Sequence, residues 1–229
     1  MKEASEALPD YWLARPGADP GPDVRASFDR LWERAIGSGG SPKVQVPRGE
    51  RWQFLCHLAD TRGVVLHGSG DPGIAVFEPR QANDLGEFGN QKAVYAAGDG
   101  IWAMFFAIVD RGRIPSVTNA CVRLADVEGR VSGPRYVFSI SRSALPDRPW
   151  RSGTVYVLPG DTFELQPPLR FGQFEVRVPQ VASFVAVKPL ARVAVDPEDF
   201  PFLSQIRGHD DGRLAEYAHA LETGAPWPE

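Results

Sequence analysis

The chain has 229 residues, a formal net charge of −4 and 43% hydrophobic residues. This composition is typical of a soluble globular protein and excludes a disordered chain, and the acidic balance argues against a dedicated nucleic-acid binder. The two cysteines form neither a metal-ligand spacing nor a disulfide framework, which favours a reducing compartment. The first residues lack the apolar core of a signal peptide, and no stretch is long and apolar enough to span a bilayer. We therefore expect a cytoplasmic protein with no membrane partner.

The first 62 residues are predicted to form a lead-in and a small helical element. Asp23 can cap a helix whose apolar residues recur at helical spacing. A segment rich in Gly and Ser at 37–42 ends this helix, and a second short helix is expected at 49–60. Two helices of this size are short for an independent domain.

From Gly63 onward the sequence predicts short strands around one buried helix. Apolar runs at 64–66 and 93–97 are typical of buried strands, and a glycine-rich loop at 67–73 follows the first of them. Asp99 can cap a helix at 100–110 that is apolar nearly all round, so we expect its aromatic residues to lie in the core. The polar segment before the second strand, which includes residues 87–90, is expected to be a loop that either covers a cleft or lies on the surface.

The second half of the chain is predicted to form strands followed by a helix. Strands are expected at 118–123, 135–140, 153–158, 173–178 and 183–195. A helix is expected at about 211–222, within a carboxy-terminal tail. The order of these elements predicts an α+β fold with a helical element at 1–62, a core at 63–201 and a helical tail at 202–229.

Two segments are candidates for chemistry. His67 follows an apolar strand, and the small residues Gly68 and Ser69 after it permit a ligand to approach the backbone closely. Tyr95 lies in the next apolar strand, so a strand, a loop, a second strand and a capped helix can bring it to the same cleft as His67. The alternatives are a histidine in a surface turn and a tyrosine packed in the core. The histidines show no zinc-ligand spacing, so no metal site is expected.

A family resemblance is carried by four short segments in a fixed order: LHGS at 66–69, FEPR at 77–80, VYAAGD at 94–99 and VYVL at 155–158. They resemble the ADP-ribosyltransferase fold of the diphtheria-toxin and poly(ADP-ribose) polymerase branch, and are similar to its bacterial and phage members. The resemblance covers about residues 63–201. It implies a split antiparallel β-sheet whose cleft holds NAD. The N-terminal helical element and the C-terminal helix predicted above lie outside the resemblance.

The resemblance also implies roles for individual residues, with NAD as substrate and no metal. His67 would hydrogen-bond the nicotinamide ribose, the Gly68 backbone would hold the carboxamide, and Tyr95 would stack on the nicotinamide ring. Ser69 is a further candidate for a ribose contact. Arg80 is a candidate for a phosphate of the dinucleotide, the alternative being a solvated loop arginine.

The third catalytic position of the family, a glutamate, falls on Gln180 in our alignment. Glutamine can hydrogen-bond a ribose hydroxyl, but it offers no negative charge to an oxocarbenium-like transition state and cannot act as a base. Three hypotheses stay open. Gln180 takes the role in a slow or mono-transferring enzyme, Glu175 or Glu164 is the true third residue, or the domain binds NAD without turnover.

The sequence thus favours an NAD-dependent ADP-ribosyltransferase or NAD glycohydrolase. The acceptor is a protein, a nucleic acid or a small molecule, and the sequence does not choose among them. The alternative function is a catalytically inactive module of the same fold that binds a nucleotide or a partner.

Overall fold

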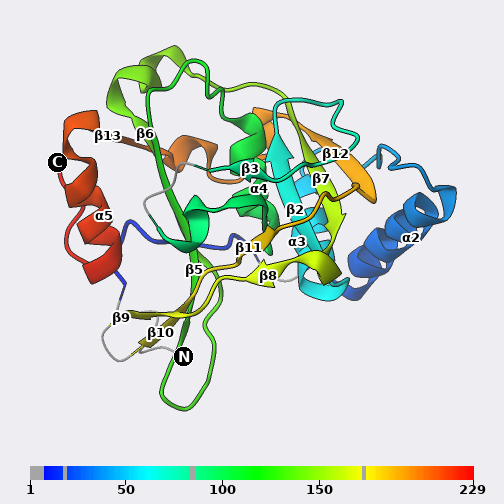
Figure 1. The fold of residues 1–229 in the computed structure, drawn as a ribbon, viewed down its shortest axis with the longest axis horizontal. Helices are drawn as coiled ribbons and strands as arrows, with labels where there is room; N and C mark the ends of the chain where they lie inside the picture. The colour runs from blue at the N-terminus through cyan, green and yellow to red at the C-terminus, as the bar shows by residue number, and fades with distance from the viewer. Residues whose placement is uncertain (1–7, 18–19, 83–85, 172–173) are drawn as a thin grey trace.

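The computed structural model describes residues 8–17, 20–82, 86–171 and 174–229. It shows an α+β fold of two mainly antiparallel β-sheets, with helices near both ends of the sequence (Figure 1). The α+β class expected from the order of the elements is confirmed.

The first sheet has the strand order β1-β6-β5-β10-β9, and β13 pairs in parallel with β6. Its longest strands, β5 and β6, pair with each other along most of their length. The strands are β1 (Leu13–Ala14), β5 (Val117–Ala125), β6 (Arg135–Ser141), β9 (Leu169–Phe171), β10 (Phe174–Arg177) and β13 (Arg207–His209).

The second sheet has the strand order β12-β7-β2-β4-β11-β8, and β3 also pairs with β4. Its strands are β2 (Val64–Ser69), β3 (Arg80–Gln81), β4 (Lys92–Ala97), β7 (Gly153–Pro159), β8 (Glu164–Leu165), β11 (Gln180–Ser183) and β12 (Ala191–Val195). All six residues of β2 pair with β7, whereas β2 meets β4 at one position only, Leu66 opposite Ala97. The two strands therefore separate where β2 continues into His67 and Gly68.

The helices are α2 (Pro22–Ser38), α3 (Arg51–Thr61), α4 (Gly100–Ile108) and α5 (Leu214–Thr223). Short 3-10 turns lie at Phe88–Asn90, Arg142–Asp147, Gly160–Thr162, Pro197–Asp199, Leu203–Gln205 and Asp211–Arg213. In Figure 1, α2 and α5 lie at opposite sides of the molecule. Within the described part of the chain, no helix has the length and apolar character needed to cross a membrane.

Helix α4 lies between the two sheets and forms the centre of the core. Eight of its nine residues are buried, and the Asp99 side chain caps it by accepting the backbone N–H of Trp102 at 3.0 Å. The ring of Phe105 lies 4.8 Å from that of Phe138 in β6, which joins the helix to the first sheet. The helix contacts β2 and β7 of the second sheet as well.

The cap of α4 is itself held by a buried ion pair. Asp99 is 1% exposed, and its carboxylate accepts hydrogen bonds from Arg15 at 2.7 Å and from the Tyr136 hydroxyl at 2.8 Å. A buried carboxylate is tolerated when it is paired and hydrogen-bonded in this way. The lead-in that carries Arg15 thus fixes the start of α4.

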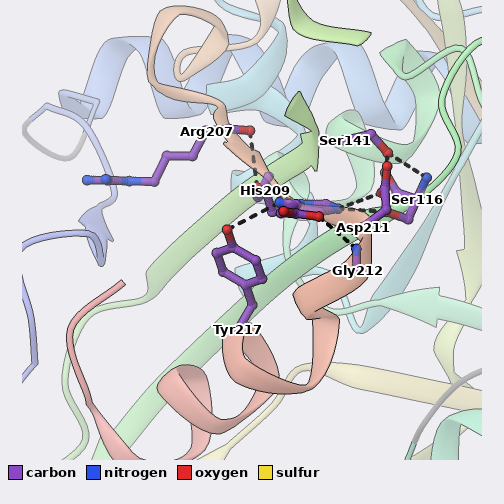
Figure 2. A network of polar contacts seen from close by, with 9 residues as sticks. Ser116, Ser141, Arg207, His209, Asp211, Gly212 and Tyr217 are labelled. Carbon is purple, nitrogen blue, oxygen red and sulfur yellow. Dashed lines mark hydrogen bonds and ion pairs between the residues drawn. The ribbon is translucent and has the colours of Figure 1, made fainter. Parts of the chain in front are cut away.

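A polar network attaches α5 to the first sheet (Figure 2). His209 is fully buried, and its ring nitrogens lie 2.8 Å from the Ser139 hydroxyl and 2.7 Å from the Ser116 hydroxyl. Asp211 accepts hydrogen bonds from Ser116 and, at 2.7 Å, from Ser141. Because Asp211 begins the turn that leads into α5, the network fixes where this helix lies against β5.

Most of the elements expected from the sequence are present. Strands β1, β8, β9 and β13 were not expected, and α2 begins at Pro22, so Asp23 lies inside this helix and does not cap it. Three further differences concern the second sheet and the segment before β4. The first strand continues to Ser69, so His67 lies within a strand and not in a turn. The polar loop before β4 contains β3 and a 3-10 turn. The single strand expected at 183–195 is wrong: β11 ends at Ser183 and β12 begins at Ala191, because the chain must cross from β4 on one side of β2 to β7 on the other.

Candidate functional site

A cleft of about 860 Å³ lies where β2 and β4 separate. This volume is within the range of small-molecule and cofactor sites. Its walls come from both sheets, from α4 and from the segment that precedes β4. The residues of interest are His67 and Gly68 in β2, Tyr95 in β4, Phe106 in α4, Asn119 in β5 and Gln180 in β11.

The His67 ring spans the gap between the two separating strands. Its Nδ1 lies 2.7 Å from the carbonyl oxygen of Tyr95, and since a carbonyl only accepts, Nδ1 carries the proton and donates. Burial lowers the pKa of His67, so the ring is neutral near pH 7. The other nitrogen, Nε2, is therefore an unprotonated acceptor.

Gly68 is placed by its contact with α4. A Cβ atom at this position would lie 1.9 Å from the carbonyl oxygen of Ala103 and 2.7 Å from the backbone nitrogen of Ala107. Only glycine therefore lets β2 lie this close to the helix. The backbone of Gly68 borders the cleft at the point where β2 has no described partner in β4.

Tyr95 connects the cleft to the segment before β4. Its hydroxyl accepts the backbone N–H of Gln91 at 2.8 Å and donates to the carbonyl oxygen of Phe88 at 2.9 Å. These bonds hold the 3-10 turn Phe88–Asn90 against the strand. Glu87, Phe88 and the half-buried ring of Tyr95 all line the cleft, so the segment at 87–90 forms one of its walls.

The aromatic residues of α4 divide between the core and the cleft. Phe105 and Trp102 are buried in the core, as expected, although Trp102 also borders the cleft, whereas Phe106 is only half-buried and lines the cleft. The indole N–H of Trp102 donates to the side-chain oxygen of Asn119 at 2.6 Å. One side of α4 faces the space left where β2 and β4 separate, so an aromatic residue on that side lines the cleft.

Gln180 lies beside the point where the strands separate. It pairs with Ala97, the residue of β4 that also faces Leu66. Its carbonyl oxygen accepts the N–H of Gln166 at 2.9 Å, but its side-chain amide makes no hydrogen bond to any described residue. Gln180 is half-buried and lines the cleft.

The glutamates proposed as substitutes for Gln180 lie elsewhere. Glu164 is exposed on β8, and Glu175 in β10 is paired with Arg177 at 2.7 Å; neither lines the cleft. Glu87 and Glu222 do line it. Glu222 was not a candidate from the sequence, because no local pattern indicates that α5 reaches this cleft.

Two of the predicted NAD contacts lie outside the cleft lining. The Ser69 hydroxyl accepts the backbone N–H of Asp71 at 3.1 Å, and Arg80 is exposed on β3. Arg111, which no pattern in the sequence indicated, lines the cleft instead. The sequence signal that could have found Arg111 is its position directly after α4, because that helix follows the strand that carries Tyr95.

The structure brings His67, Gly68, Tyr95 and Gln180 around one cleft. Comparisons with protein-family models, with curated proteins and with solved structures found no match for this chain. In the described part of the chain, no three His, Cys, Asp or Glu side chains are grouped so that they could hold a metal ion. A neutral imidazole, a glycine backbone, aromatic rings and an amide suit a ligand with a flat ring, an amide and hydroxyl groups.

Proposed function

We propose that this chain binds NAD in the manner of the ADP-ribosyltransferase fold and breaks its nicotinamide–ribose bond. ADP-ribose passes to an acceptor or to water. The observation that carries the proposal is the convergence of His67, Gly68, Tyr95 and Gln180 on one cleft. The sequence selected these residues from segments far apart, and the separation of β2 and β4 supports a split sheet with NAD in the opening.

The groups of the cleft match the parts of NAD. The nicotinamide ring lies against the aromatic ring of Tyr95, which suits a flat cation. Its carboxamide hydrogen-bonds the backbone of Gly68. A ribose hydroxyl donates to Nε2 of His67, which is free to accept because Nδ1 donates to Tyr95. These contacts orient the glycosidic bond toward Gln180.

The reaction moves positive charge from the nicotinamide ring to the ribose. The bond between nicotinamide nitrogen and ribose carbon breaks, its electron pair leaves with nicotinamide, and the nucleophile forms a new bond to the same carbon and releases a proton. The amide of Gln180 can hold a ribose hydroxyl but cannot neutralise the positive ribose. A carboxylate at Glu222 or Glu87 would supply that charge, since both line the cleft.

An inactive nucleotide-binding module is the second candidate function. It is favoured by the uncharged side chain at position 180 and by the positions of Glu164 and Glu175 outside the cleft lining. In this case the same groups bind NAD or a similar nucleotide, and no bond breaks.

One pair of measurements tests both functions. Nicotinamide release from NAD is followed with and without cell lysate as a source of acceptors, and NAD binding is measured by calorimetry. The variants are His67→Ala and, as a control outside the cleft, Arg80→Gln. Release that is lost only in His67→Ala supports the enzyme, and dependence on lysate separates a transferase from a glycohydrolase.

Binding that depends on His67 without release supports the binding module. The absence of both binding and release from the natural chain would overturn both functions. Release that persists in His67→Ala would show that the proposed site is wrong.

A further inference from the structure

His209 is an ionisable side chain that is closed off from water between the first sheet and α5. Its side chain is 0% exposed, and the ring of Tyr217 in α5 lies 5.7 Å from the imidazole. The hydroxyls of Ser116 and Ser139 face the two ring nitrogens, as Figure 2 shows for Ser116. His209 does not line the cleft, so the proposed reaction makes no use of it.

The hydrogens of this network determine where the neutral ring carries its proton. The carboxylate of Asp211 only accepts, and hydrogen bonds from Ser116 and Ser141 hold its pKa below the usual value. Ser116 gives its one hydrogen to Asp211, so it can only accept from Nε2 of His209. In a neutral ring, Nδ1 is then unprotonated and accepts from the Ser139 hydroxyl. Both ring nitrogens are therefore satisfied without a charge on the ring.

A second proton on the ring would bind to Nδ1. Ser139 would then accept from Nδ1 and turn its hydrogen to the carbonyl oxygen of Arg207, 3.1 Å away. No hydrogen-bonding group loses its partner, but a positive charge now lies in a site without water, which is costly. The Asp211 carboxylate, 3.6 Å from Nε2, offsets this cost only in part, because its side chain is 42% exposed and water screens it.

The surrounding charges leave the neutral ring favoured. Burial lowers the pKa of His209, whereas Asp211 and Asp210 raise it, and burial is the larger effect. Arg213 and Glu216 near the start of α5 pair with each other at 2.9 Å. Other titratable neighbours are Arg207 on β13, Arg142 in the turn packed against Gly208, and Tyr217 in α5.

We propose that His209 is a pH sensor whose neutral ring holds α5 against the first sheet and whose protonation weakens that docking. Asp211 begins the turn into α5 and Tyr217 lies on this helix, so the ring is enclosed only while α5 is docked. With α5 undocked, the ring has the pKa of an exposed histidine, about 6.5, and binds more protons below that pH. Docking is therefore strongest above about pH 6.5 and weakens as the pH falls. The inference does not rest on the proposed function, although α5 also carries Glu222 into the cleft.

Hydrogen exchange and NMR on the full chain test this sensor. Exchange of the α5 amides is measured at about pH 5 and pH 7 and expressed as protection relative to an unstructured chain, which removes the intrinsic effect of pH. We expect the protection of α5 to be roughly 10-fold lower at the acidic pH, and the pKa of His209 from NMR to lie below 6.5. His209→Gln keeps a polar side chain that cannot be protonated, so it should abolish the difference. His219→Gln is the matched control, because His219 is exposed on the same helix, and it should behave as the natural chain does.

Asp211→Asn gives an independent test, which holds even if His209→Gln does not fold. Its amide oxygen can still accept from Ser116 and Ser141, but the negative charge is gone, so the pKa of His209 should decrease further. A pKa of His209 at or above 6.5, or equal protection of α5 at both pH values, would overturn the inference. An acid-induced loss of protection in His209→Gln as large as in the natural chain would overturn it too, since another group would then be the sensor.

Discussion

His67 donates a 2.7 Å hydrogen bond from Nδ1 to the carbonyl oxygen of Tyr95, across the gap where β2 and β4 separate. The bond links two residues whose strands pair only at Leu66 and Ala97. It fixes the tautomer of the imidazole and leaves Nε2 as the acceptor. One side chain thus links the two strands beside the gap.

Replacing His67 by asparagine separates these two roles. An asparagine side-chain amide can still donate to the Tyr95 carbonyl oxygen, but it has no atom at the position of Nε2. We expect nicotinamide release to fall about 100-fold while the free energy of unfolding changes little. His67→Ala should lose both activity and stability. Equal activity of His67→Asn and the natural chain, in a steady-state assay, would contradict the role of Nε2.

The activity should depend on the protonation of the same ring. Burial places the pKa of His67 below its usual value of about 6.5. Protonated Nε2 can no longer accept a hydrogen bond, so kcat/KM should be constant above about pH 7 and fall as the pH decreases through this lowered pKa. The profile is measured from about pH 5 to 8. A decrease with the same midpoint in His67→Asn would assign the titration to another group.

The close approach of β2 to α4 predicts a large effect at Gly68. The Cβ atom of Gly68→Ala would meet the carbonyl oxygen of Ala103 at 1.9 Å, so strand and helix must move apart. We expect a loss of about 1–3 kcal/mol or more in unfolding free energy, measured with denaturant. Gly133→Ala is the control, because its Cβ has no atom within 4 Å. Similar stability of the two variants would show that this contact is not tight.

Gln180→Glu tests whether the missing charge limits turnover. A carboxylate in place of the free amide would stabilise positive charge on the ribose, and we expect nicotinamide release to rise about 100-fold. Gln180→Ala should lower both NAD affinity and release. If Gln180→Glu releases no more nicotinamide than the natural chain, charge at this position does not limit the reaction.

Glu222→Gln examines the carboxylate that α5 brings to the cleft. If Glu222 supplies the charge, this variant should lower kcat for nicotinamide release about 10-fold or more and change KM little. Glu216→Gln is the control on the same helix, since Glu216 pairs with Arg213 at 2.9 Å and does not line the cleft. An unchanged kcat in Glu222→Gln would leave Glu87 as the carboxylate to test.

Elements with a strong local pattern were predicted well from the sequence. Helix α4 begins after its Asp99 cap and is buried on nearly every side, as its continuous apolar run indicated. The segment at 183–195 was predicted poorly, because apolar residues continue through a connection that crosses the sheet. An apolar run favours a strand, yet in this connection Phe184 and Val185 are exposed, so hydrophobicity indicated neither the end of β11 nor burial here.

The sequence by itself determined the α+β class and the chemistry of single residues: a histidine beside a glycine, a tyrosine before a capped helix, and a glutamine without charge. Only the tertiary structure decided that Arg111 and Glu222 line the cleft and that Ser69 and Arg80 do not. The reason is that local patterns depend on neighbouring residues, whereas the walls of a cleft depend on distant contacts. One of these distant contacts is the hydrogen bond between Ser116 and His209. The two residues lie 93 positions apart, and their bond helps to fix where α5 packs.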